Sequence, residues 1–268
     1  MARSVHDRLL RVAREQARPY NELQQRFAME RLLCRLSRSA FADRFTLKGA
    51  LAFLTWSGAE KLHRPTMDID LLGQSSNSEK ELLKLFRTVC RQPVEQDGLV
   101  FDPAGITLEP IAADAEYEGI RLRVPGRLGN ARVVVQVDIG FGDRPTPRPV
   151  RREVPSVLGF PAPKLSAYRP ESTIAEKFQV MLDLGTRNSR MKDFADLYYL
   201  SGRFDFDGAV LAQAIARTCR RRHTSVPAEP VCLSVEFGND AQKQTQWTAF
   251  RRKSRLLDLP ADFADVIA

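Results

Sequence analysis

At 268 residues, with 43% hydrophobic and 28% charged residues, the chain has the composition of an ordinary globular protein and room for one large or two small domains. Its 41 Lys and Arg residues exceed its 33 Asp and Glu residues, and the net charge of +8 favours polyanionic partners such as RNA or DNA. No apolar run approaches the roughly 18 residues that cross a bilayer, so we expect no membrane partner. The four cysteines show no CxxC spacing, which fits a cytoplasmic protein without zinc sites or disulfides.

Two amphipathic helices are predicted at the N-terminus, one before Pro19 and one after Asn21, because apolar residues recur there at helical spacing. The second helix carries four arginines that fall largely outside its apolar stripe: Arg26, Arg31, Arg35 and Arg38. We interpret these arginines as a solvated face, with contact to nucleic acid as the alternative.

The stretch 44–73 predicts a strand over 45–47, a turn at Lys48-Gly49, a helix over 50–54 and a second strand over 66–72. Alternate residues of a strand share a face, so Asp68 and Asp70 point the same way, about 7 Å apart. Two like charges on an apolar strand require a positive partner, for which Mg²⁺ is the best candidate. The alternative is a strand face that is simply in contact with water.

The Lys48-Gly49 turn adds a second chemical feature beside these carboxylates. Glycine lets backbone approach a ligand closely, and the start of a helix offers unpaired N–H groups to phosphate. A phosphate-binding turn next to a pair of carboxylates that can bind metal favours phosphoryl or nucleotidyl transfer.

Further along, the pattern predicts a helix over 78–90 and strands over 106–111, 119–124 and 132–141. The last strand is apolar enough to be central, yet it contains Asp138, which shares a face with Gln136 and Gly140. A carboxylate on such a strand needs a partner. That partner is either a nearby Arg or Lys, or the same cation that Asp68 and Asp70 hold.

The segment 142–163 holds six of the sixteen prolines and is predicted to be an extended connection rather than more sheet. It divides the chain into a mixed N-terminal domain, 1–150, and a helical C-terminal domain, 151–268. Helices are expected over 171–184, 189–200 and 208–218, and Asp193 and Asp196 lie on one face of the second. Both acids alone could be surface charges. The third helix ends in a basic cluster, Arg217, Arg220, Arg221, Arg222 and His223, which either contacts phosphate or is a solvated helix end.

Five motifs, LKGA, RPTMDIDLL, VDIGFGD, AYRPESTIAEKF and NSRMKDFADLYYL, stand in this order between Phe45 and Gly202. Together they resemble the AbiEii/AbiGii family of nucleotidyltransferase toxins from toxin-antitoxin pairs. The resemblance implies an α/β (α+β) fold, in which a polymerase-β-like mixed sheet with flanking helices is joined to a helical C-terminal domain. It also implies transfer of a nucleotide from an NTP to RNA, with the 3′ end of tRNA as the expected acceptor, since some members modify it, and a cognate antitoxin protein as partner.

The resemblance also assigns roles to individual residues. It implies that Asp68, Asp70 and Asp138 hold two Mg²⁺ ions, that Lys177 contacts the triphosphate and that Asp196 is an orienting carboxylate; Asp138 is also a candidate general base. The residues that it implies for nucleotide binding are Lys48, Gly49, Ala50, Thr66, Glu176, Arg190, Lys192 and Asp193. Ala50 departs from the superfamily, which usually has Gly or Ser there, so one phosphate contact from a hydroxyl is lost.

Two other functions stay open at this point. One is transfer of a nucleotide to a hydroxyl of a protein or small molecule, and the other is a non-catalytic module that binds nucleic acid or a partner. The retained acids Asp68, Asp70 and Asp138 argue against the second. The chain contains no GxxxxGK[ST], GxGxxG, HExxH or GxSxG motif, which argues against other nucleotide, metal and nucleophile chemistries.

Overall fold

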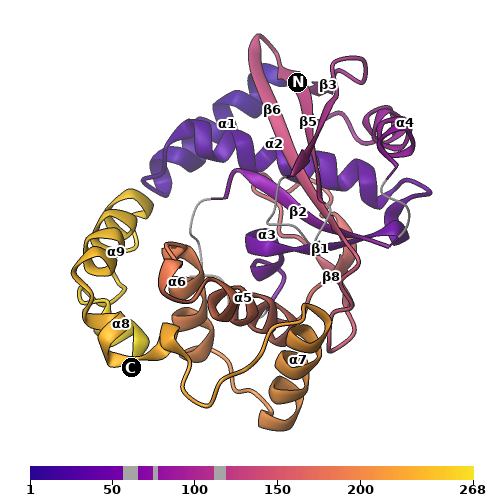
Figure 1. Cartoon of the computed structure of the whole chain (residues 1–268). Helices are drawn as coiled ribbons and strands as arrows, with labels where there is room; N and C mark the ends of the chain where they lie inside the picture. The colour runs from indigo at the N-terminus through magenta and orange to yellow at the C-terminus, as the bar shows by residue number, and fades with distance from the viewer. Residues whose placement is uncertain (57–65, 75–77, 112–118) are drawn as a thin grey trace. The chain divides into compact units, whose positions relative to one another are not determined.

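The computed structural model describes residues 1–56, 66–74, 78–111 and 119–268 (Figure 1). The chain forms two compact units. The first contains the described residues of Met1–Thr55, Pro65–Asp143 and Val150–Tyr168, and the second contains those of Trp56–Arg64, Arg144–Pro149 and Arg169–Ala268. The domain limits 1–150 and 151–268 stay a prediction.

The first unit is built on one mixed sheet of eight described strands, in the order β3-β5-β6-β2-β1-β8-β7, with β4 also paired to β5. β2 runs parallel to β6 and β1 parallel to β8, while the other pairs are antiparallel. The strands are β1 (Phe45–Lys48), β2 (Asp68–Gly73), β3 (Leu99–Phe101), β4 (Thr107–Ile111), β5 (Gly119–Leu128), β6 (Ala131–Phe141), β7 (Val150–Glu153) and β8 (Lys164–Ala167). The predicted mixed sheet is confirmed.

Apolar and polar residues alternate along the strands, and this alternation decides which face of the sheet is buried. On β6, Val133, Val135, Val137 and Ile139 are at most 6% exposed, while the residues between them face the other side. Helix α2 (Tyr20–Ser37) packs against β6, and α1 (Ala2–Glu15) and α4 (Glu79–Cys90) pack against α2. The helices therefore cover the apolar face, and the polar side chains of the strands lie on the other face.

A two-residue loop, Gly129-Asn130, fixes the register of the β5–β6 hairpin. Gly129 has φ +60°, as the first residue of a type II′ turn requires. From this turn the ladder runs without interruption to the pair of Gly119 and Gly140. The turn therefore determines which β5 residues lie beside the acidic residue of β6.

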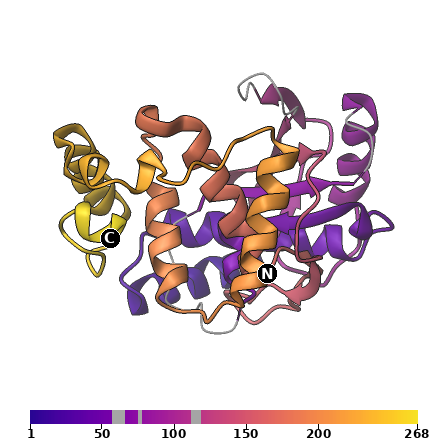
Figure 2. The same ribbon diagram turned by 60° about the horizontal axis from the view of Figure 1, so that its bottom comes forward.

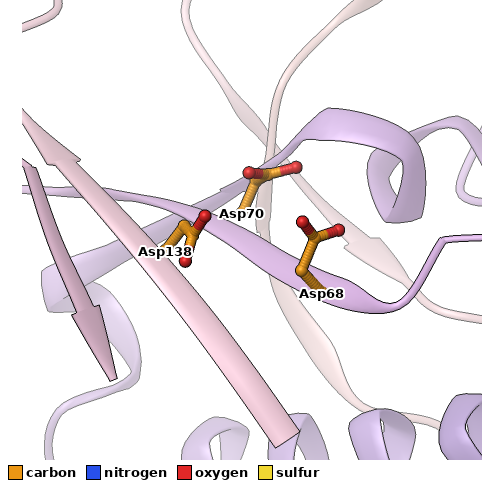
Figure 3. Close-up of side chains that lie close together, drawn as sticks. All are labelled: Asp68, Asp70 and Asp138. Carbon is orange, nitrogen blue, oxygen red and sulfur yellow. The ribbon is translucent and has the colours of Figure 1, made fainter. Parts of the chain in front are cut away.

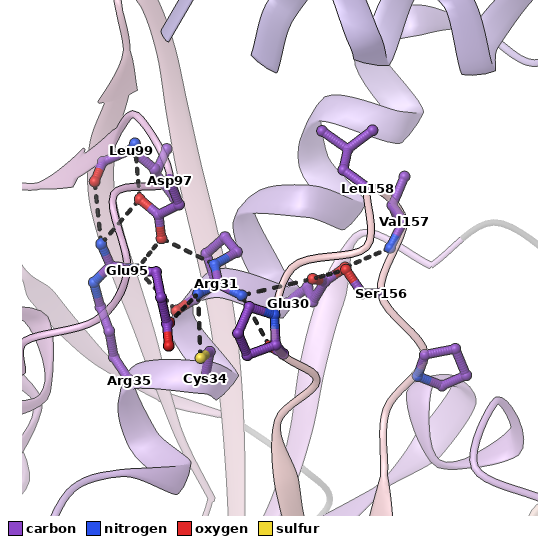
Figure 4. A network of polar contacts seen from close by, with 12 residues as sticks. Glu30, Arg31, Cys34, Arg35, Glu95, Asp97, Leu99, Ser156, Val157 and Leu158 are labelled. Atoms are coloured by element: carbon purple, nitrogen blue, oxygen red, sulfur yellow. Dashed lines mark hydrogen bonds and ion pairs between the residues drawn. The ribbon is translucent and has the colours of Figure 1, made fainter. Parts of the chain in front are cut away.

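The arginines of α2 differ from the sequence interpretation. Arg31 is 0% exposed and Arg35 is 6% exposed, so the predicted solvated face is wrong for both (Figure 4). Asp97, itself 2% exposed, accepts hydrogen bonds from Arg31 Nε at 2.9 Å and from Arg35 NH1 at 2.7 Å. This network joins α2 to the segment before β3, because two guanidinium groups inside the protein need a carboxylate partner.

Glu30, the neighbour of Arg31, is also buried and joins α2 to a different segment (Figure 4). Its carboxylate accepts hydrogen bonds from Ser156 Oγ and from the backbone N–H of Val157, both at 2.8 Å. Burial raises the pKa of Glu30, although these two hydrogen bonds and the charge of Arg31 oppose that rise. The loop that follows β7 is therefore fastened to the same helix.

The segment 142–163 is more ordered than predicted. It contains β7, which pairs with β8 at the edge of the sheet, so the expectation of a connection without sheet is wrong there. The four residues of β7 include no proline, so each has a backbone N–H available for pairing with β8, while Pro149 and Pro155 lie just outside the strand.

The second unit is helical in its described part. α5 and α7 lie side by side (Figure 2). An aromatic cluster is centred on Phe263, whose ring lies beside those of Phe194, Phe237 and Trp247. Its helices are α5 (Pro170–Leu184), η2 (Gly185–Arg187), α6 (Met191–Ser201), α7 (Gly208–Arg221), η3 (Val231–Leu233), α8 (Val235–Asn239), α9 (Ala241–Ser254) and α10 (Ala264–Ile267). Within the described ranges, no helix is long and apolar enough to cross a membrane.

Candidate functional site

Three carboxylates meet on the polar face of the sheet, where β2 and β6 run side by side. Asp70 lies directly opposite Asp138 in the register, and Asp68 lies opposite Gln136. One carboxylate oxygen from each of Asp68, Asp70 and Asp138 can be chosen so that all three lie within 4.8 Å of one another (Figure 3). The structure therefore brings together the three acids that the sequence selected.

Asp138 also has a protein partner, Arg121 on β5, its direct neighbour across the hairpin. The guanidinium of Arg121 donates from Nε to Oδ1 at 2.8 Å and from NH2 to Oδ2 at 2.7 Å, a bidentate pair. The hydrogen bonds to Asp138 raise the pKa of Arg121. The alternative of an arginine partner for Asp138 is therefore confirmed, while a cation shared with Asp68 and Asp70 stays a prediction.

The donor set of this cluster fits a hard divalent cation. Mg²⁺ prefers carboxylate oxygens, and three carboxylates from two adjacent strands supply them without any sulfur or imidazole ligand. Each carboxylate has about four lone-pair positions, so the two bonds from Arg121 leave Asp138 able to ligate. On Asp68, Oδ1 accepts a hydrogen bond from the Thr66 hydroxyl at 2.8 Å, which fixes that side chain.

The Lys48-Gly49 turn lies beside Asp70, because Lys48 is the register partner of Asp70 in the β1–β2 ladder. Gly49 begins the five-residue helix α3 (Gly49–Phe53) with φ +64°. A Cβ atom at this glycine would lie 1.9 Å from Oδ2 of Asp70. Only glycine therefore allows the backbone to turn this close to the carboxylate. The ammonium of Lys48 lies 3.8 Å from Asp143 Oδ2.

We expect Gly49→Ala to reduce the nucleotide transfer that the resemblance implies by roughly 100-fold or more, because the added methyl group must displace the carboxylate of Asp70. Gly159→Ala is the matched control, since Gly159 has φ +72° and nothing lies within 4 Å of its Cβ position. Both variants carry a backbone strain of about 1 kcal/mol. Transfer assays and thermal unfolding of both variants would separate the effect of backbone strain, which they share, from that of displacing the Asp70 carboxylate, which only Gly49→Ala causes. Equal activity in both variants would contradict the role of this contact.

In the second unit, partly buried Lys177 forms an ion cluster with two buried acids, Asp193 and Asp196. The ammonium of Lys177 lies 2.5 Å from Asp193 Oδ1 and 2.8 Å from Asp196 Oδ2. Both aspartates are at most 3% exposed, so the alternative of ordinary surface charges is wrong for them. Burial raises the pKa of Asp193, but the charges of Lys177 and Arg190 lower it more, to about 2.

The remaining predicted residues have simpler surroundings. Arg190 donates from Nε to Asp193 at 2.7 Å, Glu176 lies 3.8 Å from Arg222, and Lys192 is exposed. Ala50 is buried in α3. The roles of all these residues in binding nucleotide stay predictions.

Sequence reasoning missed Arg121, although a signal for it was present. Once Gly129-Asn130 is taken as a two-residue hairpin loop, Leu128 pairs with Ala131, and seven further steps along each strand reach Arg121 and Asp138. The sequence interpretation ended β5 too early, at residue 124, and therefore never connected the strand to this turn.

One family model and several solved structures match this chain. The family model described as nucleotidyl transferase AbiEii toxin, type IV toxin-antitoxin system, matches residues 31–268. Among solved structures, the nucleotidyltransferase toxin MenT4 from Mycobacterium tuberculosis H37Rv has a TM-score of 0.57 at 18% identity, over 97% of this chain and 93% of that chain. JHP933 from Helicobacter pylori has a TM-score of 0.46 at 14% identity, over 89% of this chain and 97% of that chain. The comparison with curated proteins found no match.

The similarity to MenT4 shows a shared fold, and the family model covers most of the chain, including the acidic cluster and the ion cluster of Lys177. The chain therefore belongs to the AbiEii family of nucleotidyltransferase toxins of type IV toxin-antitoxin systems.

Proposed function

We propose that this nucleotidyltransferase moves a nucleotide from an NTP to the 3′ end of tRNA, with Mg²⁺ held by Asp68, Asp70 and Asp138. The observation that carries the proposal is the convergence of three carboxylates from β2 and β6 beside the turn that holds Lys48. The net charge of +8 supports an RNA acceptor over a small molecule.

The reaction forms a bond between the acceptor hydroxyl oxygen and the α-phosphorus, while the bond to the bridging oxygen of the β-phosphate breaks and pyrophosphate leaves. When bound, Mg²⁺ supplies Lewis-acid chemistry that acidifies the hydroxyl and neutralises phosphate charge. Lys48 provides a cation for the departing phosphates, and Gly49 exposes its backbone to them. The proton of the hydroxyl passes to Asp138, on a lone pair that Arg121 does not use, and then to water.

In the second unit, we assign Lys177 to the triphosphate and Asp196 to the orientation of its ammonium. Asp193 also orients the Lys177 ammonium, and it forms a second ion pair with Arg190. Two buried carboxylates around one ammonium fix its position, so little conformational entropy is lost when it meets a phosphate. Glu176, Arg190 and Lys192 remain our proposed nucleotide contacts, and membership of the family supports an antitoxin protein as partner.

The test is incubation of the purified chain with Mg²⁺, each of four α-labelled NTPs and total tRNA, followed by a denaturing gel. We expect label on tRNA from one or a few nucleotides, loss of label when EDTA removes the metal, and loss of label in Asp70→Asn. If the label appeared on a protein or small molecule instead, that molecule and not tRNA would be the acceptor. If the folded protein labelled no molecule at all, nucleotide transfer itself would be contradicted.

A further inference from the structure

The polar face of β4, β5 and β6 extends from the acidic cluster to the hairpin turn. Along β5 the residues alternate, with Ile120, Leu122 and Val124 buried at 6% exposure or less. The residues between them point to the face that carries Asp138, because Arg121 is the register partner of Asp138. β5 and β6 run side by side over this whole length (Figure 1).

Four arginines lie on this face, and we call them the arginine face: Arg121, Arg123 and Arg127 on β5, and Arg132 on β6. Arg121 donates hydrogen bonds to Asp138. The NH2 atom of Arg123 lies 3.1 Å from Oε1 of Glu109 on β4, and both side chains of this ion pair are exposed. Arg121 and Arg123 are about 7 Å apart along β5, and Arg127 follows about 14 Å further on, beyond Pro125. Because Arg121 and Arg123 pair with Asp138 and Glu109, the uncompensated positive charge lies at the Arg127 and Arg132 end.

The far end of the arginine face carries an unfavourable pair. Arg127 and Arg132 are exposed and lie directly opposite each other in the register. Like charges in this arrangement are destabilising. Within the part of the chain that the structure describes, no hydrogen bond or ion pair engages either guanidinium. A polyanion bound here would relieve the repulsion between the two arginines.

Apolar side chains lie beside these arginines on the same face. Val100 of β3 is the register partner of Arg127 and is 70% exposed, and Val134 of β6 is 47% exposed. Exposed apolar residues next to arginines suit a single strand of nucleic acid, whose phosphates pair with the guanidinium groups while its bases rest on apolar surface.

From these observations we infer that the arginine face is the docking surface for the acceptor RNA. The terminal hydroxyl lies at Asp138 and the strand runs along the β5–β6 hairpin toward Gly129. Arg132 and Asp138 are six positions apart on β6, a span of about 20 Å, enough for several nucleotides. The inference rests on the proposed function, because it requires RNA as acceptor.

The test is the double variant Arg127→Glu with Arg132→Glu. We expect its Kd for tRNA, measured by fluorescence anisotropy, to rise at least tenfold, and the slope of log Kd against log salt to fall by roughly 1.4, at about 0.7 for each lost phosphate contact. KM for tRNA should rise together with Kd, because both residues lie on the inferred binding surface for the RNA strand. Thermal unfolding of Arg127→Gln with Arg132→Gln, expected at or above the wild-type midpoint, checks the fold.

The matched control is Lys80→Glu with Lys84→Glu, which makes the same charge change at two exposed residues of α4. If the lysine and arginine double variants lost the same amount of affinity for tRNA, the change in net charge alone would explain the loss, and the inference would be overturned. If wild type labels tRNA and the arginine double binds it normally, the inference alone fails. If wild type neither labels nor binds any RNA, the proposed acceptor fails together with the inference.

Discussion

Asp70→Asn and Asp68→Asn are each expected to lower nucleotide transfer by roughly 100-fold or more while leaving the fold intact. Asparagine has nearly the shape of aspartate but supplies one neutral oxygen, so the cluster that joins Asp68, Asp70 and Asp138 loses a charged ligand. Transfer from labelled NTP and binding of Mn²⁺, followed by electron paramagnetic resonance, measure the two consequences separately.

Thermal stability should move in the opposite direction to activity. Each substitution removes repulsion between like charges on adjacent strands, so the midpoint of unfolding should stay the same or rise. Asp43→Asn is the control, because Asp43 is 87% exposed and pairs only at the surface with Arg151. Full activity in Asp68→Asn and in Asp70→Asn, or wild-type Mn²⁺ affinity in both, would remove the metal assignment.

Asp97→Asn should destabilise the first unit by about 3 to 5 kcal/mol, because buried Arg35 loses its carboxylate partner and buried Arg31 loses its nearest one. Urea unfolding, with hydrogen exchange of peptides from α2 and β3, measures this loss and locates it. Asp43→Asn, which breaks an exposed ion pair, should change stability by less than about 1 kcal/mol. A loss of similar size in both variants would show that the network contributes little.

The pH dependence of this loss has a definite sign. Burial raises the pKa of the Asp97 carboxyl. The hydrogen bonds from Arg35 and Arg31, together with the charge of Arg35, lower that pKa by more than burial raises it, so it lies below its usual value. The contribution of a carboxylate with a lowered pKa is complete above about pH 3.9 and is lost as pH falls through the folded-state pKa. The difference between wild type and Asp97→Asn should therefore be full at pH 7 and shrink below about pH 3.9.

A double-mutant cycle measures the interaction energy between Arg35 and Asp97 apart from the effect of each single substitution. Arg35→Leu combined with Asp97→Asn should lose less stability than the sum of the two single variants, because the second change removes a charge that the first left buried. An additive result would mean that the two side chains act independently, which their contact at 2.7 Å opposes.

Local patterns in the sequence were sufficient for most elements and for the strand faces on which the three acids lie. Alternation placed Asp68 and Asp70 on one face, and the apolar run around Asp138 placed it on a central strand, because both properties depend on neighbours within a few residues. The same kind of reasoning found the turn at Gly49, where the positive φ and the contact with Asp70 now explain why the residue is glycine.

Partners that lie far apart in the chain were decided by the tertiary structure alone. Arg31 and Arg35 have the spacing of surface residues, but the segment that carries Asp97 folds over α2 and encloses them. β7 became a strand because β8 lay beside it, although its flanking prolines indicated a loop. By itself the sequence determined which groups face the same side of an element, since periodicity is local. Only the fold decided which charges are buried and paired, because pairing depends on the segment opposite.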